Sequence, residues 1–273
     1  MSDLDRSPLG RATSYPDRYD RGLLFPIERA PLRAELGIGI ALPFDGVDLW
    51  TAYELSWLDA DGKPQVAIAT FSVPANSPQL VESKSVKLYL TAFNQTRFAS
   101  DSQVAATLAR DLGAATGATV DVALTLPAGF AALPHAELSG EFLDDLPIAA
   151  VDSEPAPEAL VAGGPGVAEI LCTRLFRSVC PVTGQPDYAS VQLAYRGARI
   201  DRAGLLRYLV SFRRHPGFHE HCVERMFTDV WRCCEPEALA VYARFTRRGG
   251  IDINPYRTSG GASSPAPART ARQ

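Results

Sequence analysis

The chain of 273 residues has few cysteines and no long apolar run. Its five cysteines are sparse, odd in number and include no C-x-x-C pair, which argues against a disulfide framework and favours a reducing compartment. No apolar stretch approaches the roughly 20 residues that cross a bilayer. The first residues carry acidic side chains and no apolar core, so we expect no secretory signal. These absences predict a cytoplasmic protein with no membrane partner.

An excess of positive charge is also missing. The net charge of -4 and the isoelectric point near 5.6 predict no direct nucleic-acid partner, although they do not exclude binding of one small base. Gly37-Ile38-Gly39 lacks the third glycine of a Rossmann motif, and no βαβ pattern surrounds it. The hydrophobic fraction of 46% and charged fraction of 21% are typical of a soluble globular protein with a sizeable core.

Composition divides the chain into two structured modules. We expect a mobile N-terminus at residues 1–16 and a first module at 17–128. An Ala-, Pro- and Gly-rich linker at 129–167 precedes a second module at 168–257. The low-complexity tail at 258–273 is predicted to be disordered.

The first module has the pattern of two strands, two helices and a strand. Alternating apolar residues predict strands at 49–57 and 65–73, joined as a hairpin. Helical spacing follows at 83–93 and 103–112, and a strand at about 119–126 closes the module.

The second module repeats this order. A short hairpin is predicted from 189–195 with its turn at Arg196-Gly197, followed by helices at 202–212 and 219–234 and a strand at 239–246. A Y-L-x-x-F string occurs in the first helix of each module, beginning at Tyr89 and at Tyr208. Together these patterns predict an α+β protein of two β-β-α-α-β units, each an antiparallel sheet with helices on one face.

Cys180 and Asp187 are separated by a turn that contains two prolines and Gly184. Such a turn can present a thiol and a carboxyl to one small volume. A thiolate is a nucleophile, and a nearby carboxyl can transfer protons to or from its substrate. Taken alone, the pattern is more often a buried cysteine beside a surface turn.

Three further segments carry polar groups with two interpretations each. His219 and Glu220 begin a helix, where a carboxylate is stabilised and can accept N–H groups from a purine-like edge, or can simply offset the helix dipole. The segment 81–87 contains Glu82-Ser83-Lys84, a binding motif or an ordinary helix cap. Arginines of the segment 244–250 can hold phosphate or lie in a solvated loop.

Zinc is a further possibility at this stage. His219, His221, Cys222 and Cys180 are residue types that bind zinc. Alternate positions on a helix point to different sides, which argues against this ligand set.

Taken together, these motifs resemble the NADPH-dependent 7-cyano-7-deazaguanine reductases of queuosine biosynthesis, a tRNA modification. The resemblance covers about Asp17 to Tyr256 and matches the long, two-module form, because the Glu-Ser-Lys-Ser motif precedes the cysteine. It implies the tunnelling fold, in which antiparallel sheets from several modules form a barrel with helices outside. It also implies a homodimer, because two modules cannot close a tunnel.

The resemblance implies a role for each candidate residue. Cys180 would add to the nitrile carbon to give a thioimide, and Asp187 would be the general acid and base. Two NADPH molecules would then supply hydride in turn, giving 7-aminomethyl-7-deazaguanine. The remaining roles are substrate binding by Val81, Glu82, Ser83, His219 and Glu220, and NADPH binding by Ser83, Lys84, Arg248 and Gly249, with no metal.

Two alternatives stay open from the residues. One is a zinc-dependent pterin or purine cyclohydrolase on the same fold, and the other is a non-catalytic module that binds a purine or RNA.

Overall fold

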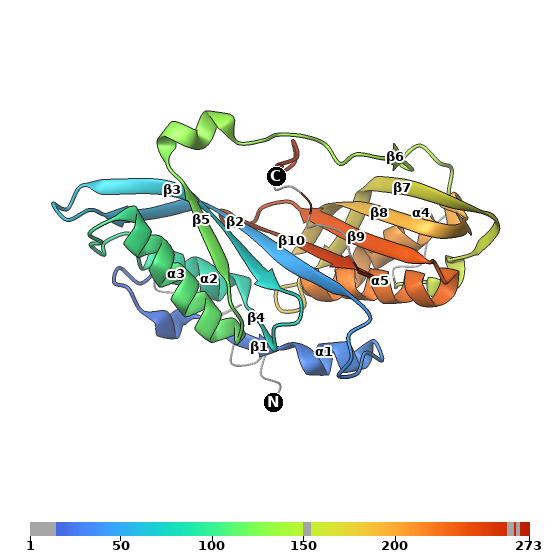
Figure 1. The fold of residues 1–273 in the computed structure, drawn as a ribbon, viewed down its shortest axis with the longest axis horizontal. Helices are drawn as coiled ribbons and strands as arrows, with labels where there is room; N and C mark the ends of the chain where they lie inside the picture. Colours follow the sequence, from blue (N-terminus) through green and yellow to red (C-terminus); the bar gives the residue numbers. More distant parts are fainter. Residues whose placement is uncertain (1–14, 150–153, 261–264, 266–267) are drawn as a thin grey trace. The chain divides into compact units, whose positions relative to one another are not determined.

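The protein is an α+β structure in two compact units (Figure 1), seen in a computed structural model that describes residues 15–149, 154–260, 265 and 268–273. The α+β prediction is confirmed, and almost all strand pairs are antiparallel. The first unit comprises Met1–Leu32, Asp48–Pro134 and Arg247–Ile253, and the second Arg33–Val47, His135–Thr246 and Asn254–Gln273.

The first unit contains a sheet in which β5, β3 and β2 are neighbours in that order. Strand β3 pairs with β5 from Ile68 opposite Thr125 to Ser72 opposite Asp121. A separate two-stranded sheet joins β1 to β4. The elements are β1 (Pro26–Glu28), α1 (Arg29–Glu35, shared with the second unit), β2 (Asp45–Leu58), β3 (Pro64–Pro74), β4 (Gln79–Val81), α2 (Ser83–Thr91), α3 (Asp101–Thr116) and β5 (Asp121–Thr125).

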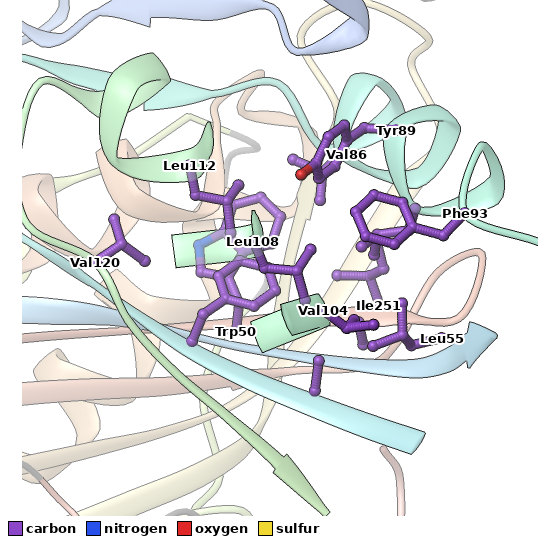
Figure 2. Close-up of a cluster of buried hydrophobic side chains, with 14 of the residues drawn as sticks. Trp50, Leu55, Val86, Tyr89, Phe93, Val104, Leu108, Leu112, Val120 and Ile251 are labelled. Atoms are coloured by element: carbon purple, nitrogen blue, oxygen red, sulfur yellow. The ribbon is translucent and has the colours of Figure 1, made fainter. Parts of the chain in front are cut away.

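The core of the first unit lies between its sheet and the helices α2 and α3 (Figure 2). Strand β2 contributes Trp50 and Ala52 and then Leu55 and Trp57 to this core, so its period-two pattern shifts by one residue between Ala52 and Leu55. The two helices and the turn after α2 contribute Val86, Tyr89, Phe93, Val104, Leu108 and Leu112, all less than 2% exposed. Burial of these side chains is the main force that holds the helices on the sheet.

The second unit is built on the long hairpin of β7 and β8, followed in the sheet by β9 and β10. Helices α4 and α5 pack against it (Figure 1). The elements are β6 (Glu141–Phe142), β7 (Ala162–Val179), β8 (Pro186–Ile200), α4 (Arg202–Ser211), α5 (His219–Cys234), β9 (Ala238–Phe245) and β10 (Ile251–Thr258), whose first residues belong to the first unit. Short 3-10 helices occur at Arg21–Leu23, Pro127–Ala132, Pro157–Ala159 and Phe212–Arg214.

The repeated Y-L-x-x-F string has an equivalent contact in each unit. In the first, the hydroxyl of Tyr89 on α2 donates a hydrogen bond of 2.8 Å to Asp111 on α3. In the second, the hydroxyl of Tyr208 on α4 donates one of 2.7 Å to Asp229 on α5. The same tyrosine therefore joins the two helices of both units, which supports the β-β-α-α-β repeat.

The hairpin predicted at Arg196-Gly197 is wrong. Strand β8 runs through Gly197 to Ile200, and Gly197 lies opposite Val167 of β7. The glycine marks a close approach instead of a turn, because a Cβ atom there would lie 3.0 Å from the Cα atom of Pro236. The true hairpin partner of β8 is β7, and its turn lies between Val179 and Pro186.

The boundaries of the two modules also differ from those expected. The expected linker contains β6 and the first residues of β7. Residues 33–47, expected in the first module, belong to the second unit, and residues 247–253, expected in the second module, belong to the first unit. Of residues 258–273, which were expected to be disordered, 261–264, 266 and 267 lie outside the described part of the chain, whereas Thr258 ends β10 and Gln273 is buried. The expected mobile N-terminus lies, except for its last two residues, outside the described part of the chain.

A buried ionic cluster anchors α5 within the second unit. The carboxylate of Glu224 accepts hydrogen bonds from Arg33 at 2.7 and 3.0 Å and from Arg257 at 2.9 and 3.1 Å. The guanidinium carbons of both arginines lie within 5.6 Å of the centre of the Phe44 ring. Because Glu224 lies one turn after Glu220, this cluster restrains the start of the helix on which candidate site residues lie.

Candidate functional site

The β7–β8 hairpin brings Cys180 and Asp187 to one end of the second unit. Ser178 lies opposite Asp187 and Val179 opposite Pro186 in the strand register, so Cys180 is the first residue of the turn. Both candidate side chains are almost buried, with 5% of Cys180 and 6% of Asp187 exposed. The turn recognised in the sequence therefore places Cys180 and Asp187 at the same end of the hairpin.

The turn is held closed by its own backbone. The N–H of Cys180 donates to the carbonyl of Gln185 at 2.8 Å, and that of Gly184 donates to the carbonyl of Cys180 at 3.0 Å. Gly184 has a φ of 68°, a conformation that favours glycine. The glycine is thus needed for the turn that fixes the thiol.

The strand before Cys180 is attached to the segment that leads into α5. The N–H of Val179 donates to the carbonyl of His215 at 3.0 Å, and the N–H of Gly217 donates to the carbonyl of Val179 at 3.1 Å. These two bonds bring the end of β7 to the N-terminus of α5.

His219, the first residue of α5, lies beside the hairpin. Its Nε2 atom is 3.5 Å from Oδ2 of Asp187, and only 12% of its side chain is exposed. Its ring stacks on Phe245 of β9, with centroids 3.8 Å apart and planes within 6° of parallel. Its buried Nδ1 atom has no hydrogen-bond partner among the described residues, which leaves a polar atom for a ligand.

Glu220 lies in the first turn of α5 and is 3% exposed. The helix starts after Phe218, whose side chain has no oxygen that could accept the first N–H groups. A buried carboxylate at this end is stabilised by the helix dipole. The second unit therefore contains four predicted residues: Cys180 and Asp187 at the end of the hairpin, and His219 and Glu220 at the start of α5.

The other cysteines are poor nucleophiles. Burial raises the pKa of Cys172 and Cys234 to about 11 and that of Cys222 to about 12, with the carboxylates of Asp187 and Glu220 contributing at Cys222. The pKa of Cys233 is also raised by burial. At neutral pH these four groups stay protonated thiols, which makes each of them a weak nucleophile.

The remaining predicted residues lie in the first unit. Glu82 is the N-cap of α2, and its carboxylate accepts N–H groups of Lys84 at 2.7 Å and Ser85 at 2.8 Å. Burial raises its pKa, although these two hydrogen bonds act in the opposite direction. The N-terminus of α2 therefore lies at Val81, Glu82 and Ser83, and the geometry of Glu82 is that of a helix cap.

The loop after β9 contains Arg248 and Gly249 and is also part of the first unit. Gly249 has a φ of 63°, and a Cβ atom there would lie 2.8 Å from Nζ of Lys87 on α2. A lysine of α2 therefore lies against this loop, and the positive φ of Gly249 disfavours any residue with a side chain there. The sequence alone assigned no role to Lys87. Its position one helical turn after Lys84 could have indicated that the two lysines share a face of α2.

Phosphate chemistry fits this second group. Ser83, Lys84, Lys87 and Arg248 supply a hydroxyl and three cationic groups, and Gly249 leaves its backbone accessible to a ligand. The structure thus sorts the predicted residues into two groups, one in each unit.

Metal ligands are not grouped in the described part of the chain. Within it, no three His, Cys, Asp or Glu side chains are placed to hold one metal ion. The zinc ligand set considered from His219, His221, Cys222 and Cys180 is therefore not assembled. None of the helices in the described ranges is long and apolar enough to cross a membrane.

Comparison with known proteins identifies two family models along the chain. Residues 15–124 match the N-terminal model of nitrile reductase, 7-cyano-7-deazaguanine reductase, and residues 186–264 match a model described as QueF-like protein. The second match includes Asp187, His219, Glu220 and Arg248.

Curated relatives match the whole length of the chain. The NADPH-dependent 7-cyano-7-deazaguanine reductase of Bordetella avium is 58% identical over 271 residues, which are 99% of each chain. The enzyme of the same name from Burkholderia pseudomallei is 58% identical over 98% of this chain and 99% of its own. The enzyme from Chromobacterium violaceum is 56% identical over 98% of this chain and 97% of its own. A solved structure of an archaeosine synthase QueF-like protein covers 37% of this chain, with 22% identity and a TM-score of 0.32.

Proposed function

The chain belongs to the NADPH-dependent 7-cyano-7-deazaguanine reductases and reduces the nitrile of that deazapurine in queuosine biosynthesis, and we propose that it does so through a thioimide on Cys180. The observation that supports this intermediate is the hairpin that holds Cys180 and Asp187 at one end of the second unit. The four other thiols have a raised pKa, so none competes as nucleophile at neutral pH.

In the first step, the sulfur of Cys180 forms a bond to the nitrile carbon, and the carbon–nitrogen triple bond becomes a double bond. Asp187 delivers the proton that the nitrogen takes up, and His219 lies within reach to return one. NADPH, when bound, supplies one hydride for each of the two reductions. The thiolate of Cys180 leaves between them, so the enzyme ends the cycle unchanged and the product is a primary amine.

Substrate recognition is proposed to depend on Glu220. Its carboxylate can accept two N–H groups of the deazaguanine edge, and its burial strengthens such charge-assisted hydrogen bonds. Val81, Glu82 and Ser83 are proposed as further substrate contacts.

The cofactor residues proposed are Ser83, Lys84, Arg248 and Gly249, and Lys87 joins them because it lies against Gly249. Three cationic side chains of the first unit match the phosphates of NADPH better than its neutral rings. The tunnelling arrangement of the sheets and a homodimer are likewise proposals, which light scattering in solution would test.

The decisive experiment is incubation with 7-cyano-7-deazaguanine in the absence of NADPH, followed by intact mass. We expect the mass to rise by one substrate, and no rise for Cys180→Ala. The matched control is Cys172→Ala, a buried thiol of the same unit, which should keep the adduct. An adduct that persists in Cys180→Ala would move the nucleophile elsewhere.

A further inference from the structure

The last residues of the chain pack against the strands of the second unit. Gln273 is 4% exposed, and its Nε2 atom donates to the carbonyl of Phe245 at 2.9 Å and to Oδ1 of Asn254 at 2.8 Å. Its Oε1 atom accepts the N–H of Thr270 at 3.1 Å. Both donors and the acceptor of this amide are therefore used within the protein.

The place of these bonds is significant. Strands β9 and β10 pair from Ala240 opposite Thr258 to Tyr242 opposite Tyr256. Phe245 and Asn254 follow on the two strands beyond that register, where the side chain of Gln273 joins them. One buried amide thus connects the ends of two strands across the sheet.

Phe245 is also the residue on which His219 stacks. The centroids of the two rings are 3.8 Å apart and the ring planes are almost parallel. The Nε2 atom of the same histidine lies 3.5 Å from Oδ2 of Asp187. Every residue in this sequence of contacts, from Gln273 through Phe245 and His219 to Asp187, belongs to the second unit.

We propose that Gln273 is a positioning residue for the nitrile reduction. By holding the end of β9, it fixes the ring of Phe245, and through that ring the orientation of His219 beside Asp187. Two contacts that orient the His219 ring are its stack on Phe245 and the neighbouring carboxylate of Asp187, so a shift of Phe245 should turn the imidazole relative to Asp187. This inference rests on the proposed roles of His219 and Asp187.

The test uses full-length Gln273→Ala and Gln273→Glu. The alanine removes both donors, and the glutamate keeps the size of the side chain but can only accept. The matched control is Arg272→Ala, because the guanidinium of the adjacent Arg272 donates to the carbonyl of Arg174 on β7 at 2.7 Å. Thermal unfolding of each variant shows whether it is folded at the temperature of the assay.

The first readout is the imidazole NMR signal of His219, assigned with His219→Gln among the four histidines of the chain. We expect this signal to move in both Gln273 variants and to stay in place in Arg272→Ala. An unmoved signal would overturn the proposal and leave Gln273 a residue that only stabilises the fold. Because this measurement needs no substrate, its outcome is independent of whether the thioimide forms.

The second readout is the rate of adduct formation at Cys180. We expect the rate to fall roughly fivefold to tenfold in both Gln273 variants. The KM for NADPH should be unchanged, since the proposed cofactor residues lie in the first unit. A moved His219 signal with an unchanged adduct rate would also overturn the positioning role, whereas absence of adduct in the unmodified enzyme would contradict the thioimide instead.

Discussion

The Nε2 atom of His219 lies 3.5 Å from Oδ2 of Asp187, longer than an ordinary hydrogen bond. The two groups are therefore neighbours without a tight mutual bond. Both side chains are almost buried in the unit that contains Cys180, and in the proposed mechanism either of them could exchange a proton with a bound nitrile nitrogen.

Asp187→Asn separates proton transfer from simple positioning. Asparagine has nearly the shape of aspartate but cannot act as an acid or base, so turnover should fall roughly a hundredfold or more. Adduct formation should slow as well, because the nitrile nitrogen needs a proton as the sulfur adds. Steady-state kinetics and intact mass measure the two effects, with NADPH binding expected to survive. Near-normal turnover would remove Asp187 as the acid and make His219 the next candidate.

Glu220→Gln tests recognition of the deazaguanine edge. A carboxylate that accepts two N–H groups is stronger than a neutral amide, so we expect substrate binding to weaken by ~2–3 kcal/mol. Calorimetry should show NADPH binding little changed. Glu237→Gln, which alters an exposed glutamate of the same unit, is the control. Unchanged substrate affinity would return Glu220 to a role in the first turn of α5.

Much of the fold could be predicted because its elements have regular apolar periods. The strands β2 and β3 and the helix α5 follow from alternation and helical spacing within a few residues. The first part of β7 could not, because its Gly163-Gly164-Pro165-Gly166 run has the composition of a loop and becomes a strand only by pairing with β8. Strand β10 was missed for a similar reason, since Pro255 lies within it.

The candidate site divides in the same way. Cys180 and Asp187 could be paired from the sequence because a short turn joins them. The stack of His219 on Phe245 and the bonds of Gln273 depend on residues far apart in the chain, whose meeting is decided by the sheet. Local patterns contain no information about such contacts.

The two equivalent tyrosines should differ in their contribution to stability. Tyr208→Phe removes the hydroxyl that donates to Asp229. The guanidinium of Arg225 is farther from this carboxylate, at 3.6 Å. We expect a loss of about 1–2 kcal/mol in the free energy of unfolding. Urea denaturation measures it, with turnover per folded molecule little affected.

Tyr89→Phe should cost less, because Asp111 keeps the hydroxyl of Tyr19 at 2.5 Å and the guanidinium of Arg110 at 2.9 Å. A carboxylate with two donors left is still well satisfied. If Tyr89→Phe lowered the free energy of unfolding more than Tyr208→Phe, the number of donors left to the carboxylate would not explain the loss of stability.

His215 should make stability depend on acid pH. Burial lowers its pKa from 6.5 to about 4, with the charges of Arg225 and His221 contributing. The unfolded chain therefore binds a proton between pH 6.5 and about 4 that the folded protein does not, so folding stability is lost as the pH falls through this window. Since the ring remains partly exposed, we expect a contribution on the order of 2 kcal/mol.

The matched variant is His215→Phe, which keeps an aromatic ring against Phe212, where the histidine ring now packs edge to face at 5.4 Å. Urea denaturation at pH 7 and at pH 4 should show a smaller loss of stability for this variant than for the unaltered protein. The backbone of His215 holds Val179, the residue before Cys180, so adduct formation should also persist to lower pH in the variant. Parallel stability curves for the two proteins would mean that the protonation of His215 is not what couples acid to unfolding.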